Sequence, residues 1–578
     1  MINQDICHCK YSQNSVIGMT FKELLHESKT MRNIFRFFTL LLLTWLVNPS
    51  LAFGSFSTLQ PDCGTVELRK IPLLKGKITK NVATVSLTLP GNQQLTLKSI
   101  RINLDRSSNP SFLAEVLASY VDSIRGKTFE TGIGSARIKN SRKNIQLNSS
   151  QTTPRNKHII SLGMSIKHDA QLDKSIGIES VELHFAGGHK MVIRSDESFR
   201  FRPGLELRAA GQDHCDTYRI PGIITTKTGT LIAVYDNRYN NSKDLQEDVD
   251  IGMSRSTDGG QTWEPMKVIM DMVEWGGRSE RLNGIGDPSV LYDPYTHTIW
   301  VAALWISGLT ENDMLWWASK PGMSPMETGQ FMLSASKDDG LTWSEPINIT
   351  EQIKDPSWQL LFQGPGMGIT MSDGTLVFPA QFKADIGQKA IDGGQYTSHS
   401  TLIYSKDGGD SWHIGTGAKP NTTEAQVVQL ADGNLMLNMR DDLNRQNKGE
   451  GNGRAVSLTR DLGRTWTPHP STNSALQEPN CMASLIAAEL PARGKKQQVL
   501  FFSNPNNKNA RTNMTIKTSL DGGYTWPETM QTELYAPAGF GYSCLTMVDE
   551  QTIGILYEGS KNLIFQKVPV SEFFGLSK

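Results

Sequence analysis

An eight-residue pattern, S-x-D-x-G-x-[ST]-W, recurs from residue 256 onward and constrains the fold of this chain more than any other feature. The copies are STDGGQTW (256–263), SKDDGLTW (336–343), SKDGGDSW (405–412), TRDLGRTW (459–466, with Thr first) and SLDGGYTW (519–526). Within a copy, Asp can accept hydrogen bonds from backbone N–H groups two residues on, and Gly supplies a position with φ > 0. Repetition at intervals of tens of residues indicates stacked or radially arranged units.

Short apolar runs that follow turn residues lie before, between and after these copies. They are found at 229–235, 299–306, 374–378, 433–437, 499–502, 553–557 and 563–568. Short strands with few helical patterns predict an all-β propeller or sandwich. Four intervals separate Trp263 from Trp526, with a mean of about 66 residues. We therefore predict a six-bladed β-propeller over residues 206–578.

Residues 53–205 contain no copy of the pattern. Their runs at 83–89, 95–104 and 180–185 alternate polar and apolar side chains, as half-exposed strands do. A small β-sandwich is therefore expected in front of the propeller, with residues 140–158 as a polar loop. This sandwich either binds carbohydrate or only packs against the main domain.

An apolar run at 37–47 follows two arginines and precedes small residues. At 11 residues it is too short to span a bilayer comfortably, and the arrangement is typical of a secretory signal peptide. We predict a signal peptide at 31–52, cleaved after Ala52, behind a polar extension at 1–30. The alternative is an uncleaved anchor. Export to the periplasm, the medium or the cell surface follows from the first interpretation, with no membrane span after cleavage.

Charge and cysteine content exclude several other classes. The chain has 58 Lys+Arg and 58 Asp+Glu, whereas a dedicated nucleic-acid-binding protein usually has a basic excess. No CxxC, HExxH or His-rich spacing follows residue 52, so no catalytic metal is expected. The four cysteines after residue 52 are Cys63, Cys215, Cys481 and Cys544. Export permits disulfides, but four cysteines allow three pairings, and isolated buried thiols are an equal alternative.

The tetrapeptide YRIP at 218–221, followed by the five repeated boxes, resembles the bacterial exo-sialidases of glycoside hydrolase family 33. The resemblance covers about residues 206–578, and the front domain is similar to the sandwich that precedes the propeller in some of these enzymes. It implies a six-bladed propeller with its active site at one end of the central axis. It also implies hydrolysis of terminal sialic acids on glycoconjugates, without a cofactor.

Sialic acid carries a carboxylate on its anomeric carbon, so its site needs fixed cations. Arginine suits this role because its planar fork bonds a carboxylate in bidentate fashion and stays charged. The resemblance implies a clamp of Arg219 in YRIP, Arg440 in LNMRDD and Arg511 in KNARTN. Glu558 in LYEG matches the acid that pairs with the first arginine, and a buried arginine needs such a partner.

The resemblance also implies three catalytic residues. Tyr542 in FGYSCL matches the nucleophile, a role that sialidases give to tyrosine rather than to a carboxylate. A neutral phenol can approach the negatively charged anomeric centre, but its pKa near 10 requires a base, and Glu424 in TTEAQ matches that base. Asp244 in the polar loop NNSKDLQED matches the general acid/base. Arg238 and Asp287 match contacts to the 4-hydroxyl region of the sugar.

Several alternatives remain open at this level. Arg445 and Arg454 compete with Arg440, and Asp248 and Asp250 compete with Asp244. The candidates for an N-acetyl pocket are Met253, Trp305, Trp316 and Trp317. A trans-sialidase or intramolecular trans-sialidase would keep the same residues, and a non-catalytic carbohydrate-binding propeller would need only the boxes. We expect a monomeric enzyme.

Overall fold

A computed structural model describes residues 63–574, with gaps at 89–94, 125–126, 152–156, 311–316, 318, 392 and 493. The expected signal peptide at 31–52 and the extension at 1–30 lie outside the described residues. All described residues belong to one compact unit, Ser57–Lys578. Within the described part of the chain, no helix is long and apolar enough to cross a membrane.

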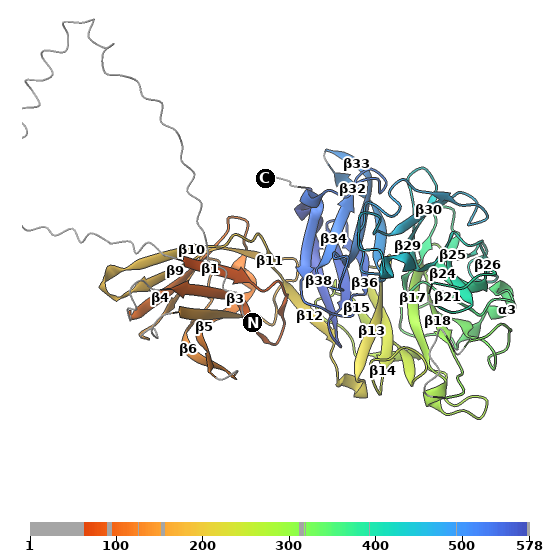
Figure 1. Ribbon diagram of the computed structural model, residues 1–578, viewed down its shortest axis with the longest axis horizontal. Helices are drawn as coiled ribbons and strands as arrows, with labels where there is room; N and C mark the ends of the chain where they lie inside the picture. Colours follow the sequence, from red (N-terminus) through yellow and green to blue (C-terminus); the bar gives the residue numbers. More distant parts are fainter. Residues whose placement is uncertain are drawn as a thin grey trace, which may run out of the picture. The chain divides into compact units, whose positions relative to one another are not determined.

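Two five-stranded sheets form the expected sandwich, which precedes the propeller in the chain (Figure 1). The first has the order β1 (Cys63–Leu68), β3 (Ile78–Thr88), β8 (Lys157–Ile166), β5 (Leu113–Ile124), β6 (Lys127–Arg137). The second has the order β10 (Lys190–Arg194), β9 (Ile176–Phe185), β4 (Leu97–Leu104), β7 (Asn144–Asn148), and β11 (Arg200–Phe201) pairs with β9. The apolar side chains of both sheets share one core. The prediction of a loop over 140–158 is wrong for β7, because Ile145 and Leu147 alternate into that core.

Six further sheets are the blades of the propeller. Blade 1 contains β13 (Thr217–Thr225), β14 (Leu231–Arg238), β15 (Val249–Ser256) and β16 (Lys267–Met270). Blade 2 contains β17 (Ile285–Asp293), β18 (Thr298–Trp305), β19 (Gln330–Ser336), β20 (Ile347–Asn348) and β22 (Gly366–Met367). Blade 3 contains β21 (Leu360–Gln363), β23 (Ile369–Thr370), β24 (Leu376–Asp385), β25 (Tyr396–Ser405), β26 (His413–Ile414) and β27 (Lys419–Pro420). A single helical turn, α3 (Thr350–Ile353), precedes β21.

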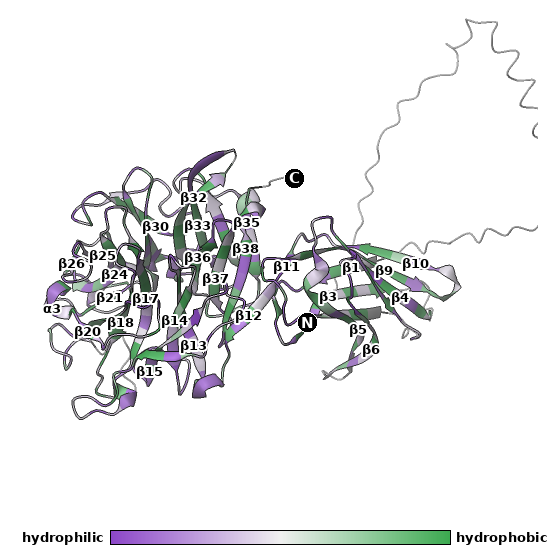
Figure 2. Cartoon of the chain, turned by 180° about the vertical axis from the view of Figure 1, so that it is seen from behind, coloured by the Kyte–Doolittle hydropathy of each residue, from purple (hydrophilic) through white to green (hydrophobic). Residues whose placement is uncertain are grey.

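The last three blades complete the ring. Blade 4 contains β28 (Thr422–Gln429), β29 (Leu435–Asp441), β30 (Ala455–Thr459) and β31 (Thr467–Pro468). Blade 5 contains β32 (Ser484–Ala492), β33 (Lys495–Pro505), β34 (Met514–Ser519) and β35 (Gln531–Tyr535). Blade 6 contains β36 (Ser543–Asp549), β37 (Thr552–Glu558), β38 (Leu563–Pro569), β12 (Pro203–Arg208) and β2 (Leu73–Leu74). The propeller strands are mainly apolar and the loops between them mainly polar (Figure 2).

Blade 6 is assembled from segments that are distant in sequence. The antiparallel partner of β38 is β12, which precedes the first blade, and Figure 1 shows the yellow β12 beside the blue β38. The expected boundary between residues 205 and 206 therefore falls inside a strand of this blade. Pairing of β12 with β38 closes the ring and covers the edge of β38.

The five repeated boxes are tight turns with one shared bonding scheme. In the first, Asp258 accepts hydrogen bonds from the backbone N–H of Thr262 at 2.9 Å and from its hydroxyl at 2.6 Å, and Gly260 N–H donates to the Ser256 hydroxyl at 3.0 Å. The carboxylate thus reaches the backbone four residues on, not two as the sequence suggested. The serine hydroxyl occupies the nearer position, which pushes the carboxylate contact further along the turn.

Candidate active site

The innermost strands of three blades are irregular at one end of the propeller. The pairing register shifts between Arg219 and Gly222, between Gly286 and Ser289, and between Thr423 and Gln426. Each irregularity holds one non-glycine residue with positive φ: Ile220 (56°), Asp287 (58°) and Glu424 (35°). Such β-bulges redirect side chains and are common beside active sites. They place Arg219, Asp287 and Glu424 out of the regular alternation of their strands.

Tyr542 is the centre around which the three expected clamp arginines gather. The guanidinium carbon of Arg219 lies 5.0 Å from the centroid of its ring, and that of Arg511 lies 5.6 Å away. The Nη1 atom of Arg440 lies 3.3 Å from the Tyr542 hydroxyl oxygen. These residues come from blades 1, 4, 5 and 6, so the ring brings together cations that are far apart in sequence.

Glu558 anchors both Arg219 and the backbone beneath Tyr542. Its Oε1 atom accepts hydrogen bonds from Arg219 Nε at 2.8 Å and from Ile220 N at 2.9 Å. Its Oε2 atom accepts from Tyr542 N at 2.8 Å. The carboxylate is buried, so its charge is compensated by the arginine and by two backbone dipoles. Ring closure is therefore a requirement for this contact, because Arg219 lies in the first blade and Glu558 in the last.

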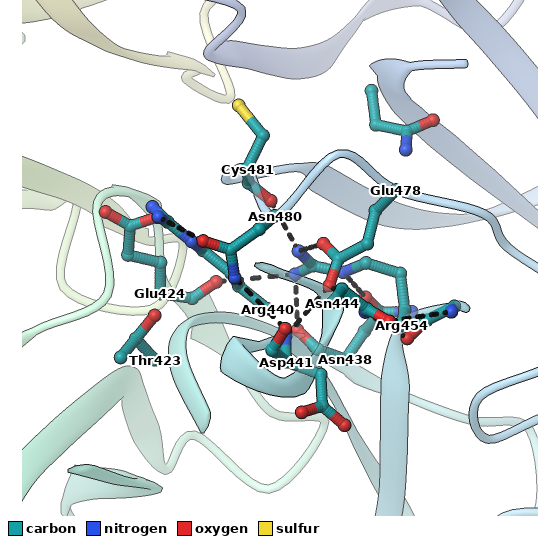
Figure 3. Close-up of polar contacts among 12 residues, drawn as sticks. Thr423, Glu424, Asn438, Arg440, Asp441, Asn444, Arg454, Glu478, Asn480 and Cys481 are labelled. Atoms are coloured by element: carbon teal, nitrogen blue, oxygen red, sulfur yellow. Dashed lines mark hydrogen bonds and ion pairs between the residues drawn. The ribbon is translucent and has the colours of Figure 1, made fainter. Parts of the chain in front are cut away.

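Glu424, Arg440 and Tyr542 form one hydrogen-bonded group. The Tyr542 hydroxyl donates to Glu424 Oε1, and Arg440 Nη1 lies 2.6 Å from Glu424 Oε2. Arg440 Nη2 donates to Asn480 Oδ1 at 2.8 Å, and Figure 3 shows Arg440 between Glu424 and Asn480. Burial alone would raise the pKa of Glu424, but Arg440 and the Tyr542 hydrogen bond outweigh it and lower that pKa. Glu424 is thus an ionised acceptor for the phenol proton.

The phenol itself is neutral in this arrangement. Burial, and then the neighbouring Glu424 carboxylate, raise the pKa of Tyr542 well above its ordinary value, against the opposing effect of Arg440 and Arg511. A neutral phenol bonded to an ionised carboxylate is the resting form of a nucleophile that depends on an adjacent base.

Arg511 is the least saturated of the three arginines. Its Nη1 donates to the Phe540 carbonyl at 2.8 Å, and its Nη2 lies 3.4 Å from the Asn480 carbonyl. No carboxylate lies within ion-pair distance of it among the described residues. Its positive charge beside Tyr542 is therefore available to an anionic ligand.

Asp244 lies in the loop between β14 and β15, between two arginines. Its Oδ1 atom lies 2.7 Å from Arg238 Nη1 and 3.6 Å from Arg219 Nη1, and its side chain is half exposed. Burial opposes ionisation, but Arg238 and then Arg219 outweigh it and lower the pKa of Asp244. The competitors differ, since Asp250 is buried beneath the Tyr239 hydroxyl at 2.9 Å and burial raises its pKa to about 8. Of the three, only Asp244 touches Arg219.

Arg238 is held by a residue that the sequence did not single out. Asp236 Oδ2 accepts from Arg238 Nε at 3.0 Å and from Nη2 at 2.8 Å, while its Oδ1 accepts from Asp287 N at 2.9 Å. Asp236 therefore joins the two expected sugar contacts. Burial and the neighbouring Asp236 and Asp244 raise the pKa of the Asp287 carboxyl well above its ordinary value.

The structure gives the remaining candidates other surroundings than those of the arginine cluster. Arg454 is fully buried and pairs with Glu478 at 2.8 Å. It therefore does not take the place of Arg440 in the arginine cluster around Tyr542. Met253 and Trp305 pack in the core shared by blades 1 and 2, and Trp316 lies outside the described residues. Trp317 alone is exposed, at 57 %. Cys215, Cys481 and Cys544 are buried free thiols.

The site thus combines three arginines around the Tyr542 phenol and an ionised carboxylate that accepts the phenol proton. It also has a half-exposed carboxylate, Asp244, which faces Arg219. These groups can bind an anionic substrate, form a covalent bond through the phenol oxygen and move protons on both sides of the reacting atom.

Comparison with known proteins gives matches over the same region. The model of the BNR repeat-like domain matches residues 220–527. A sialidase of Bacteroides fragilis (strain YCH46) is 47% identical over 413 residues, which cover 71% of this chain and 73% of that protein. A sialidase of Paraclostridium sordellii is 30% identical and covers 60% of this chain and 83% of its own length. A solved structure described as a Hadza microbial sialidase is 40% identical, with a TM-score of 0.77, and covers 88% of this chain and 100% of its own.

Proposed function

This chain belongs to the sialidase family, and from that premise we propose how its site releases terminal, α-ketosidically linked sialic acids from glycoproteins, glycolipids and oligosaccharides. The observation that supports the mechanism best is the contact of the Tyr542 hydroxyl with Glu424 inside a ring of three arginines. In this proposal hydrolysis proceeds with retention, through a tyrosyl-glycosyl intermediate.

The substrate carboxylate binds to Arg219, Arg440 and Arg511. Guanidinium groups bond carboxylates through charge-assisted hydrogen bonds, and this clamp sets the anomeric carbon above the Tyr542 oxygen. Asp287, together with Arg238, binds the hydroxyl side of the sugar ring. The clamp also offsets the negative charge that would repel an anionic nucleophile from this carbon.

In the first step, the Tyr542 oxygen bonds to the anomeric carbon while its proton passes to Glu424. The bond to the leaving oxygen breaks, and Asp244, which takes up a proton from solvent when the substrate binds, donates that proton to the leaving oxygen. The substrate carboxylate assists this donation, because its charge offsets the pull of Arg219 on Asp244 and so raises the pKa of Asp244. In the second step, Asp244 takes a proton from water as the water oxygen bonds to the anomeric carbon. Glu424 returns its proton to the departing tyrosine oxygen.

The domain organisation, location and assembly belong to the same proposal. The propeller, whose last blade includes β12 and β2, is the catalytic domain, and the sandwich that precedes it in the chain is an accessory domain that binds carbohydrate or packs against it. A signal peptide at 31–52 directs the protein to the periplasm, the medium or the cell surface, where sialylated glycans are its partners. It acts as a monomer, since all the site residues come from one chain.

The test compares Tyr542→Phe with Tyr557→Phe. Both tyrosines are buried in blade 6, but the Tyr557 hydroxyl donates only to Gln566 Oε1 at 2.9 Å. With a fluorogenic sialoside, Tyr542→Phe should lower kcat by about 10³-fold or more with the fold intact, whereas Tyr557→Phe should leave kcat near wild type. Near-normal turnover by Tyr542→Phe would refute the assigned nucleophile.

Time-resolved NMR of a sialyl-lactose digest tests the outcome of the reaction. Release of the α-anomer before mutarotation is expected for retention. An anhydro product or transfer to a second sugar would instead indicate an intramolecular trans-sialidase or a trans-sialidase. A β-anomer as first product would contradict the covalent intermediate.

A further inference from the structure

The proposed base occupies a backbone conformation that its own side chain disfavours. Glu424 has φ 35°, and the register shift between Thr423 and Gln426 takes its peptide groups out of the ladder with β29. A left-handed non-glycine residue costs about 1–3 kcal/mol and persists only where its surroundings hold it. Something other than strand pairing must therefore hold this residue in place.

On the N-terminal side, a buried glutamine holds the peptide. The Oε1 atom of Gln381, on β24 of blade 3, accepts a hydrogen bond from Glu424 N–H. Gln381 Nε2 lies 3.3 Å from the Gln363 carbonyl, and this contact turns the amide oxygen toward Glu424. Gln363 Nε2 in turn donates to the carbonyl of Asp287. Hydrogen bonds through Gln363 and Gln381 thus connect the bulge in blade 2 with the bulge in blade 4.

On the C-terminal side, a buried arginine holds the peptide. Arg454 Nη2 lies 3.4 Å from the Glu424 carbonyl oxygen. The guanidinium is fixed by Asn438 Oδ1 at 2.7 Å and by Glu478 Oε2 at 2.8 Å. Glu478 Oε1 also accepts from Asp441 N at 2.9 Å, next to Arg440 in the chain. Figure 3 shows this network beside Arg440, on the side away from the Glu424 carboxylate.

The partner of the Glu424 N–H differs in charge from those of the other bulges. The N–H groups of Ile220 and Asp287 donate to carboxylates, those of Glu558 and Asp236. The Glu424 N–H donates to a neutral amide. A carboxylate at that position would lie beside the base and raise its pKa, because like charges disfavour ionisation. A neutral acceptor holds the backbone without this effect.

We propose that Gln381 and Arg454 are positioning residues. Gln381 bonds the N–H of Glu424 and Arg454 bonds its carbonyl, and together they hold its carboxylate against the Tyr542 phenol in line with the bound sugar. They act through the backbone of the base and do not touch substrate. This inference rests on the proposed role of Glu424 as the base.

Three variants test it against a matched control. Gln381→Met and Arg454→Lys remove the hydrogen bonds to the Glu424 backbone while keeping the approximate size of the side chain. Gln381→Glu keeps the hydrogen-bond acceptor but adds a negative charge. The control is Gln330→Met, since Gln330 is also buried and bonds the Thr328 carbonyl at 2.9 Å, away from the site in blade 2. All four are measured for thermal unfolding, kcat, KM and the pH profile of kcat/KM.

Gln381→Met and Arg454→Lys should each lower kcat by about 10- to 100-fold, as small misplacements of a catalytic group do, with KM within about threefold. Gln330→Met should lower the unfolding temperature comparably and leave kcat unchanged. Gln381→Glu should move the acidic limb of kcat/KM to higher pH, a change that a purely structural role would not produce.

The inference fails if folded Gln381→Met and Arg454→Lys keep kcat within about twofold of wild type. It also fails if Gln330→Met loses as much kcat, or if the acidic limb of Gln381→Glu stays at the wild-type pH. Should Gln381→Met not fold, the kcat of Arg454→Lys and the pH profile of Gln381→Glu decide. A Glu424→Gln variant with full activity would instead refute the proposed function, which keeps the two failures distinct.

Discussion

Glu558 offers a quantitative test of the site, because one buried carboxylate serves several donors. Its two oxygens bond Arg219, the Ile220 N–H and the Tyr542 N–H. In Glu558→Gln, one of these oxygens becomes an NH2 group that faces a backbone N–H. The substitution therefore leaves one buried N–H without an acceptor. It also removes the nearer of the two carboxylates that compensate the buried Arg219 guanidinium, and only Asp244, at 3.6 Å, remains.

The expected cost follows from these two losses. An unsatisfied buried donor costs about 1–3 kcal/mol, and removal of one partner from a buried ion pair costs about 3–5 kcal/mol. The two losses overlap, so we expect the free energy of unfolding to fall by about 4 kcal/mol. Activity should fall as well, because Arg219 loses its fixed orientation and Tyr542 loses the anchor of its backbone.

The assay combines thermal unfolding with kcat/KM on a fluorogenic sialoside. Glu264→Gln is the control, since Glu264 is 40% exposed and pairs with Arg255 at 2.6 Å on the rim of blade 1. Loss of such an exposed pair costs at most about 1 kcal/mol. If Glu558→Gln unfolds within one degree of wild type and keeps its kcat/KM, the reasoning on this buried carboxylate is wrong.

Two predictions concern pH. In the free enzyme, Arg238 and Arg219 lower the pKa of Asp244, and the carboxylate of a bound substrate offsets the charge of Arg219. The basic limb of the pH profile of kcat should therefore lie at higher pH than the basic limb of kcat/KM. Superimposed limbs would contradict this prediction. Hydrogen bonds from Thr342 lower the pKa of Asp338 to about 2. The Asp338 carboxylate therefore contributes fully to the free energy of unfolding above its unfolded pKa of about 3.9, and this contribution is lost as the pH falls toward 2. The difference in unfolding temperature between wild type and Asp338→Asn should therefore narrow between about pH 4 and pH 2, and a constant difference would exclude this contribution.

The sequence predicts the fold well because its strongest signals are local. Each repeated box closes its own turn through bonds within eight residues, so its pattern is visible in the chain itself. The all-β class and the six blades follow from that spacing, and the family motif indicates which arginines and which tyrosine to examine. The structure then shows them gathered around Tyr542, although their catalytic roles remain a proposal.

The supporting residues are harder to find because their partners lie in other blades. Gln381 sits in the apolar run LVFPAQF, and its only signal is a polar residue at a buried strand position. Glu478 and Asn480 lie in a loop with no motif, and the chain alone does not show that they meet Arg454 and Arg440. The positive φ of Glu424 also depends on contacts from blades 3 and 4, which local propensity cannot report.

Closure of blade 6 by β12 has a consequence for the timing of activity. During synthesis, Arg219 leaves the ribosome more than 300 residues before Glu558, the carboxylate that must compensate it. A nascent chain that ends before β38 has its nucleophile but no closed ring to hold it against the first blade. We therefore expect catalysis to begin only when β38 pairs with β12, and a truncation that removes β38 to abolish it as completely as a substitution in the catalytic centre.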